Sequence, residues 1–161
     1  MTFDGLPMRA DLVDAAATEA FGARLSGFLR PGDLVLLEGP LGAGKTTLVR
    51  GLVAALGGDA AEVCSPTFVL LECYSVNAGA LRRVHHADLY RLRGRASAPL
   101  DEVGLGEALD DQAAVTAVEW PESWGWLGGL AARVLTVRLE YRGDARSASV
   151  QWLDEAATAS S

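Results

Sequence analysis

Apolar and polar residues form blocks along the first part of the chain, and these blocks predict strands and helices in alternation. Residues 8–14 predict a short first strand. The segment Ala15 to Leu29 predicts a helix capped by Asp14, because apolar side chains recur in it at helical spacing. Leu34–Glu38 is a nearly continuous apolar run, as expected of a buried parallel strand. After a glycine-rich loop, Lys45 to Leu56 predicts a second helix that a glycine pair ends.

The second part of the chain predicts mainly strands. They are expected at Thr67 to Val76, Leu81 to Tyr90, Ala114 to Trp120, Arg133 to Tyr141 and Ser147 to Trp152. Glycine-containing turns join the first two strands and the last two, so each of these pairs is expected to form a hairpin. Between the hairpins, residues 91–100 predict a polar loop and residues 101–109 a short helix.

The glycine-rich loop carries the most informative chemistry. Residues 39–46 match the phosphate-binding loop pattern of two glycines, a lysine and a hydroxyl at fixed offsets. Lys45 is the single lysine of the chain, and every other formal side-chain cation is an arginine. The flat guanidinium does not replace a compact ammonium that reaches between phosphates, which suggests that lysine is required here. The residues expected to bind a nucleoside triphosphate are Leu41, Gly42, Ala43, Gly44, Lys45, Thr46 and Thr47.

These elements indicate an α/β fold. We expect a single P-loop NTPase-like domain over residues 1–153, with a mixed, mainly parallel central sheet flanked by helices and carrying β-hairpins. Residues 154–161 are small and polar and are expected to form a disordered tail. A length of 161 residues suits one domain, and a hydrophobic content of 50% is typical of a globular protein.

Composition also limits the partners and the location of the protein. A formal net charge of −7 argues against autonomous nucleic-acid binding, so a partner is expected to supply most of any such contact. The sequence has no secretory signal and no apolar run that would span a bilayer, so we expect a cytoplasmic protein without a membrane partner. Cys64 and Cys73 are expected to be reduced thiols in the core. A metal site with His85 and His86 is the alternative, although this spacing fits no usual zinc pattern.

Two carboxylates are candidates for the acidic residue that a nucleotide hydrolase places near its magnesium ion. Glu119 follows an apolar strand and therefore lies at the strand end that faces the ligand crevice in open α/β sheets. A solvated glutamate at the end of a strand is the alternative. Asp88 is the second candidate, and a turn residue is its alternative role.

Three further segments have both a functional and a purely structural interpretation. A hydroxyl within residues 65–68 is suited to sense a terminal phosphate or to position a water molecule, whereas a polar bend before a strand is the alternative. Trp120 either packs on a ligand or belongs to the core. Trp124 and Trp126 follow Pro121 in a glycine-rich stretch, where they are expected to form an exposed apolar surface for a partner.

Several motifs together resemble the TsaE (YjeE) family. They are Leu41-Gly42-Ala43-Gly44-Lys45-Thr46-Thr47, Ser65-Pro66-Thr67-Phe68, His86-Ala87-Asp88-Leu89-Tyr90-Arg91-Leu92 and Val118-Glu119-Trp120-Pro121-Glu122, in the order and approximate spacing of that family. The resemblance extends from about residue 12 to residue 152 and includes a similar first helix. The phosphate loop alone is generic, but the other three motifs together are highly specific. Ala87 departs from the family, which often has a bulky aromatic residue there.

The resemblance implies a small bacterial ATPase that uses ATP and Mg²⁺. It is required for the formation of threonylcarbamoyladenosine in tRNA, but the group is transferred by a partner, TsaD, in complex with TsaB. The ATPase docks on that pair and hydrolyses ATP to support turnover, and tRNA is reached only through the complex. This agrees with the acidic charge of the chain.

The resemblance also implies roles for single residues. By motif match, Thr46 and Glu119 are the magnesium ligands, and Lys45 contacts the outer phosphates. The other roles are a water-orienting or switch carboxylate at Asp88, a switch residue at Thr67, an aromatic ring near the nucleotide at Trp120 and a position near the adenine at Thr18.

Two other functions use the same phosphate loop. A small-molecule or nucleotide kinase would use Arg91, Arg93 and Arg95 as a lid, but the chain leaves little room for a separate acceptor-binding domain. A guanine-specific switch would need an Asn-Lys-x-Asp type base reader, and the only lysine already lies in the phosphate loop.

Overall fold

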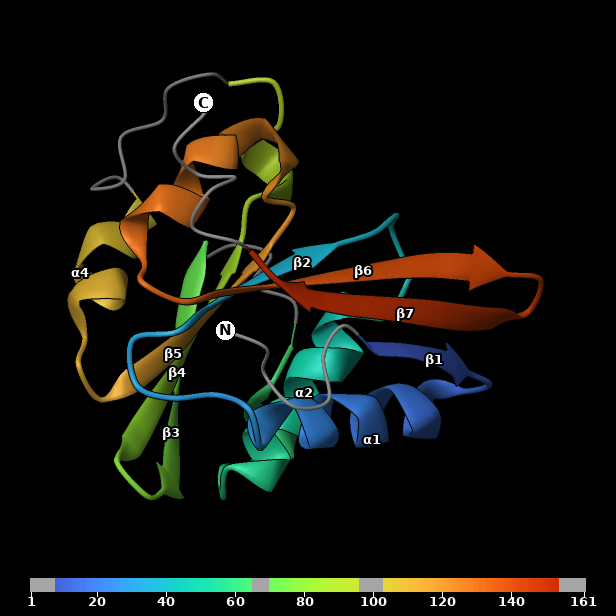
Figure 1. Cartoon of the computed structure of the whole chain (residues 1–161), viewed down its shortest axis with the longest axis horizontal. Coiled ribbons are helices and arrows are strands. Elements are labelled where there is room, and N and C mark those ends of the chain that lie inside the picture. Colours follow the sequence, from blue (N-terminus) through green and yellow to red (C-terminus); the bar gives the residue numbers. More distant parts are fainter. Residues whose placement is uncertain (1–7, 65–69, 96–102, 154–161) are drawn as a thin grey trace.

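The computed structural model describes residues 8–64, 70–95 and 103–153, and its central feature is a mixed β-sheet (Figure 1). Within these residues the sheet has seven strands in the order β1-β7-β6-β2-β5-β4-β3. The strands are β1 (Met8–Leu12), β2 (Leu34–Glu38), β3 (Leu71–Ala78), β4 (Leu81–Asp88), β5 (Ala114–Glu119), β6 (Val134–Arg142) and β7 (Ala145–Trp152). The helices are α1 (Ala15–Ser26), α2 (Lys45–Ala55) and α4 (Leu105–Asp110), with the 3₁₀ segments η1 (Ala60–Glu62), η2 (Tyr90–Leu92) and η3 (Glu122–Leu130).

The centre of the sheet is parallel and its flanks are antiparallel. Strands β6, β2, β5 and β4 run parallel to one another, whereas β1–β7, β6–β7 and β3–β4 pair in antiparallel fashion. Strands β2 and β5 are buried along nearly their whole length, which their continuous apolar runs allow and a central parallel strand requires. The predicted α/β fold with a mixed sheet, flanking helices and hairpins is therefore confirmed.

One face of the sheet packs against α1 and α2, which lie side by side (Figure 1). The apolar core there includes Leu25, Leu48 and Leu52 from the helices. The two helices approach each other so closely at Gly51 that a Cβ atom added there would lie 1.9 Å from the carbonyl oxygen of Glu19. Only glycine therefore fits at this position. The close contact holds α2, which begins directly after the glycine-rich loop, against α1.

The other face is covered by α4 and η3 over the β2–β5–β4 part of the sheet. Trp124 and Leu127 of η3 are fully buried in this second core. The prediction that Trp124 lies on an exposed apolar surface was therefore wrong. Trp126 is 44% exposed, and its ring stacks on that of Trp124 at a centroid distance of 5.7 Å. The η3 segment packs inward because it buries the apolar side chains of Leu34 and Leu36 on this face of the sheet.

Helix α1 begins as predicted and ends earlier than expected. The Asp14 carboxylate accepts the Ala17 N–H at 2.8 Å and so caps the helix. The helix ends at Ser26, because the N–H groups of the following residues bond to carbonyls three positions back and tighten the last turn. Strand β3 begins at Leu71, later than predicted, and residues 65–69, 101–102 and the expected tail 154–161 lie outside the described residues.

The two cysteines were predicted to lie in the core, and this was wrong. Cys64 and Cys73 are both free and exposed. Cys73 lies in β3, an edge strand that alternates between buried and exposed positions, and its side chain is on the exposed side. Among the described residues, no group of three or more His, Cys, Asp and Glu is arranged to hold a metal ion. None of the described helices is long and apolar enough to cross a lipid bilayer.

Candidate nucleotide and magnesium site

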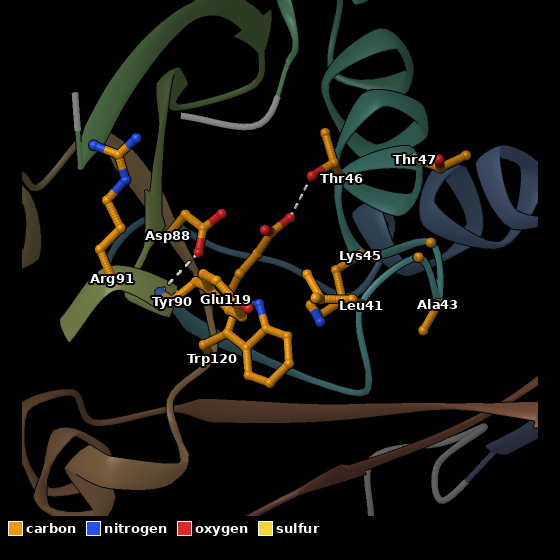
Figure 2. Close-up of a pocket in the computed structure, with 12 residues that line it drawn as sticks. Leu41, Ala43, Lys45, Thr46, Thr47, Asp88, Tyr90, Arg91, Glu119 and Trp120 are labelled. Atoms are coloured by element: carbon orange, nitrogen blue, oxygen red, sulfur yellow. Dashed lines mark hydrogen bonds between the residues drawn. The ribbon is translucent and has the colours of Figure 1, made fainter. Parts of the chain in front are cut away.

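The phosphate loop and the carboxyl ends of β4 and β5 line one cavity of about 390 Å³ (Figure 2). The sheet brings them together because Leu37 of β2 and Asp88 of β4 both pair with Glu119 of β5. The residues that line the cavity are Leu41, Gly42, Ala43, Gly44, Lys45, Thr46, Thr47, Asp88, Tyr90, Arg91, Glu119 and Trp120. All seven loop residues predicted to bind nucleotide thus share one cavity with Asp88, Glu119 and Trp120.

The loop is shaped by its own backbone and by the β6–β7 hairpin. Gly44 is the N-cap of α2 and has φ +104°, a left-handed backbone conformation that residues other than glycine rarely adopt. The α2 helix begins at the next residue, so its positive end is directed at the cavity. The Tyr141 hydroxyl donates to the carbonyl of Leu41, and Arg146 donates to the carbonyl of Gly42 at 3.3 Å. The hairpin therefore holds two peptide groups of the loop from outside.

Lys45 is nearly buried, with 6% of its surface exposed. Its ammonium donates to the carbonyl oxygens of Gly39 and Pro40 and lies 3.9 Å from the centroid of the Trp120 ring. Burial lowers the pKa of Lys45, and the charges of Glu119 and other nearby carboxylates oppose that shift. The cation is thus held by loop carbonyls and an aromatic face in the lining of the cavity.

Glu119 is buried beside the start of α2. Its Oε1 accepts a hydrogen bond of 2.7 Å from the Thr46 hydroxyl and lies 3.3 Å from Nε2 of His86. Burial is the largest single influence and raises its pKa, but the hydrogen bonds from His86 and Thr46 and the charge of Lys45 together bring the pKa below its ordinary value. Glu119 is therefore an ionised carboxylate at neutral pH, and it is not the solvated residue at a strand end that was the alternative.

Thr46 and Glu119 form a donor set that fits a magnesium ion. A hydroxyl and a carboxylate are hard oxygen ligands, and Mg²⁺ bound with a nucleotide takes one or two such protein ligands while phosphate oxygens and water supply the rest. The 2.7 Å contact between the two oxygens brings both ligands to one point at the edge of the cavity. The residues present therefore fit the ion, with no third protein ligand required.

Asp88 lies at the end of β4 next to Glu119, on the same side of the cavity (Figure 2). Its Oδ1 accepts the N–H of Tyr90 at 2.9 Å, a bond that turns the chain after the strand. Asp88 is thus a turn residue that also lines the cavity, and its role beside a magnesium ion stays a prediction.

Trp120 has an unusual backbone. Its φ of +60° is the one positive value among the described residues other than glycine. The conformation aims the indole across the cavity, over Lys45 and with its ring centroid 5.0 Å from that of Tyr90. Trp120 is partly exposed, lines the cavity and also packs against the second core.

Thr18 lies on the opposite side of the loop, in α1. It is 3% exposed, and its hydroxyl donates to the backbone carbonyl of Asp14 at 3.3 Å. With Gly42, Gly44 and Arg146 it helps to line a second cavity of about 160 Å³ beside the loop. Thr67, the predicted switch residue, lies outside the described residues.

The structure also brings residues to the site that the sequence did not single out for it. His86 contacts Glu119 from β4, and Tyr74 contacts His86 from β3. The sequence did contain one signal for His86. It lies two residues before Asp88, and alternate residues of a strand face the same side of the sheet. Tyr141 and Arg146 gave no such signal, since about 100 residues separate them from the loop they contact.

Comparisons with known proteins agree with the motifs. The family described as threonylcarbamoyl adenosine biosynthesis protein TsaE matches residues 12–148. A Mycobacterium leprae protein named tRNA threonylcarbamoyladenosine biosynthesis protein TsaE is 42% identical over 142 residues, which are 84% of this chain and 85% of that protein. A Streptomyces coelicolor protein of the same name is 46% identical over 101 residues, which are 63% of this chain and 65% of that protein.

A solved structure has the same fold. The crystal structure of YdiB from Bacillus subtilis matches with a TM-score of 0.61 at 28% identity, covering 89% of this chain and 83% of that one. Three of the four motifs contribute residues to the lining of the cavity, and the family match over most of the chain and the relatives above 40% identity point the same way. This chain belongs to the TsaE family.

Proposed function

We propose that this protein is a Mg²⁺-dependent ATPase that supports the formation of N6-threonylcarbamoyladenosine in tRNA. The observation that carries the proposal is the convergence of a phosphate loop, Lys45 and the Thr46–Glu119 oxygen pair on one cavity. The family and the names of the relatives support the pathway, and the donor set supports the cofactors ATP and Mg²⁺.

In the proposed mechanism the loop binds the phosphates and the strand ends provide the polar groups around them. Backbone N–H groups of the loop and the start of α2 bind the phosphate oxygens. The Lys45 ammonium leaves its loop carbonyls to contact the outer phosphates. Thr46 and Glu119 hold the magnesium ion, which when bound neutralises charge that develops on the phosphates. Asp88 orients the attacking water or responds to the terminal phosphate.

The remaining site residues have proposed roles in enclosing the nucleotide. Trp120 covers the phosphate end of the cavity, because its ring already lies over the lysine. The second cavity beside Thr18 is suited to the adenine, because it adjoins the loop on the side away from Glu119. The switch role of Thr67 rests on the motif alone.

The proposed partners are TsaD and TsaB, with tRNA bound through their complex. The net charge of −7 disfavours direct contact with a polyanion. We further propose that hydrolysis by the isolated protein is slow, because a partner completes the site, and that the protein acts in the cytoplasm as a single domain over residues 1–153.

Phosphate release from ATP, with and without a TsaB–TsaD pair, tests the proposal. We expect release that requires Mg²⁺, is slow for the protein alone and rises when the pair is added. The wild-type protein with EDTA is the control. No release under any of these conditions would contradict the proposal, and transfer of phosphate to a hydroxyl acceptor would favour a kinase instead.

A further inference from the structure

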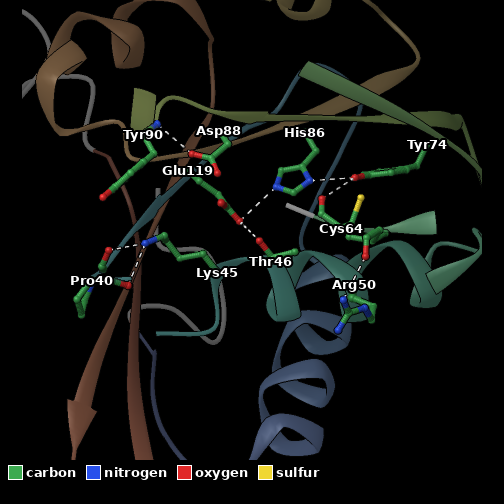
Figure 3. A network of polar contacts seen from close by, with 12 residues as sticks. Pro40, Lys45, Thr46, Arg50, Cys64, Tyr74, His86, Asp88, Tyr90 and Glu119 are labelled. Carbon is green, nitrogen blue, oxygen red and sulfur yellow. Dashed lines mark hydrogen bonds and ion pairs between the residues drawn. The ribbon is translucent and has the colours of Figure 1, made fainter. Parts of the chain in front are cut away.

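A polar chain that is buried from Tyr74 to Glu119 runs behind the proposed magnesium site (Figure 3). It consists of the Cys64 carbonyl, the Tyr74 hydroxyl, the His86 ring and the Glu119 carboxylate, with successive distances of 3.4, 3.2 and 3.3 Å. His86 is completely buried, and Tyr74 and Glu119 are each 3% exposed. Buried polar groups of this kind are stable only when their hydrogen bonds are made, so each member constrains the orientation of the next.

The direction of the bond between His86 and Glu119 follows from the hydrogens available. The Tyr74 hydroxyl has one hydrogen, which it donates either to Nδ1 of His86 or to the Cys64 carbonyl. In either case Nε2 of His86 faces Oε1 of Glu119, and a carboxylate oxygen accepts hydrogen bonds, so Nε2–H donates to Glu119.

This bond differs from the other hydrogen bond that Glu119 accepts. Thr46 is itself a proposed ligand of the cation, so its hydroxyl belongs to the site. His86 approaches from β4, where its backbone pairs with Ala117 of β5, and it lies behind the carboxylate. The carboxylate is therefore oriented by a group that does not itself bind the ion.

We propose that His86, oriented by Tyr74, is a positioning residue that holds the Glu119 carboxylate ready to bind the divalent cation. The proposal rests on the function proposed above, because it needs a cation that binds together with a nucleotide. Groups that hydrogen-bond a metal ligand from behind typically change metal affinity by about 10- to 100-fold when they are removed.

The test measures cation binding directly rather than hydrolysis. Mn²⁺ binding to the full chain is followed by electron paramagnetic resonance in the presence of a non-hydrolysable imido analogue of ATP. We expect His86→Leu to weaken Mn²⁺ binding by about 10- to 100-fold, with the affinity for the analogue in EDTA unchanged. His86→Gln can place an amide N–H near the position of Nε2 and is expected to restore most of the affinity. Tyr74→Phe removes only the hydroxyl and is expected to weaken binding by less.

His85 provides the matched control. It is the neighbouring residue in β4 and therefore faces the other side of the sheet, where its Nε2 contacts Asp111 at 2.8 Å. His85→Leu is expected to leave Mn²⁺ affinity unchanged, and near-ultraviolet circular dichroism checks the fold of every variant.

The outcomes separate this inference from the proposed function. Unchanged Mn²⁺ affinity in folded His86→Leu overturns the positioning role while the proposed function stands. If His86→Leu does not fold, Tyr74→Phe decides, and wild-type Mn²⁺ affinity in folded Tyr74→Phe would overturn the role, because Tyr74 is proposed to orient the His86 ring. No Mn²⁺ binding by the wild-type protein would overturn both.

Discussion

The loop side and the strand side of the cavity are stabilised in different ways. On the loop side, residues 39–47 are contiguous, and backbone conformation, the start of α2 and contacts within the loop fix their positions, with two added hydrogen bonds from the β6–β7 hairpin. On the strand side, Asp88, Glu119 and His86 come from two strands and are held by sheet register and buried side-chain hydrogen bonds. A local motif thus supplies the ammonium proposed to bind phosphate, whereas long-range packing supplies the carboxylates.

The largest effect is expected on the loop side. Lys45→Ala removes the only ammonium in the cavity's lining and should abolish detectable nucleotide binding, since loss of a buried charged partner costs about 2–5 kcal/mol of binding free energy. Calorimetric titration with ATP and Mg²⁺ measures this. Lys45→Arg is the matched control that keeps the charge, and it should bind much more weakly than the wild-type protein because its planar group differs in shape. Wild-type affinity in Lys45→Ala would remove the role of the loop.

A different pattern is expected on the strand side. Glu119→Gln keeps the size of the side chain but loses its charge, so Mg²⁺-dependent hydrolysis should fall by at least about 10-fold, the smaller of the effects typical of metal-site partners. Nucleotide affinity without the cation should change much less. Single-turnover phosphate release and titration in EDTA separate these quantities. Equal losses in hydrolysis and in cation-free nucleotide affinity would contradict the assignment of nucleotide binding to the loop side and of cation binding to the strand side.

The packing that supports the loop side should be sensitive to one added methyl group. Gly51→Ala forces a Cβ atom against the Glu19 carbonyl, and overpacking of this kind lowers the free energy of unfolding by about 1–3 kcal/mol. Urea denaturation measures the change. Gly27→Ala is the control, because its added Cβ atom would lie an ordinary 3.5 Å from the carbonyl oxygen of Arg24 and the φ of −66° suits alanine. Equal stability of Gly51→Ala and the wild-type protein would show that the helices can move apart.

The smallest effect concerns the other end of the strand side. Arg83 and His85 of β4 bond to Asp111, which precedes β5, and the Arg83 hydrogen bond in particular holds the pKa of Asp111 well below its usual range. A carboxyl with a lower pKa in the folded state adds stability above its unfolded pKa of about 4, and this stability is lost as the pH falls toward the folded value.

Asp111→Asn should therefore lower the free energy of unfolding at pH 7 and flatten its decline below about pH 4. Denaturation across that pH range measures both effects. Asp110→Asn, one residue earlier, is the control, and a full acid-induced decline in Asp111→Asn would contradict the assignment. The partial exposure of Arg83 keeps the expected change modest.

The sequence predicted what is encoded locally. The strand Leu34–Glu38, the start of α2 and the place of Glu119 at the end of a buried strand all follow from short patterns, and the structure has them. The domain limits and the roles of the site residues stay predictions. The prediction for Trp124 was wrong because a glycine-rich segment does not reveal that it packs over the apolar side chains on the second face of β2.

Other features depend on residues far apart in the chain. Cys73 was placed in the core because its strand was not recognised as an edge strand, and strand order is not visible in a single sequence. The contact between His86 and Glu119 needs the parallel pairing of β4 with β5, which only the folded sheet supplies. The backbone of Trp120 gave no signal either, because propensity disfavours a positive φ for an aromatic residue.

The positive φ of Trp120 has a consequence for substitutions at this position. A left-handed tryptophan costs on the order of 1–3 kcal/mol, which glycine would relieve at once. Glycine would also take away the indole that lies over the lysine. Relief of backbone strain and loss of the ring's packing against the second core and Tyr90 therefore act in opposite directions on the stability of a Trp120→Gly variant.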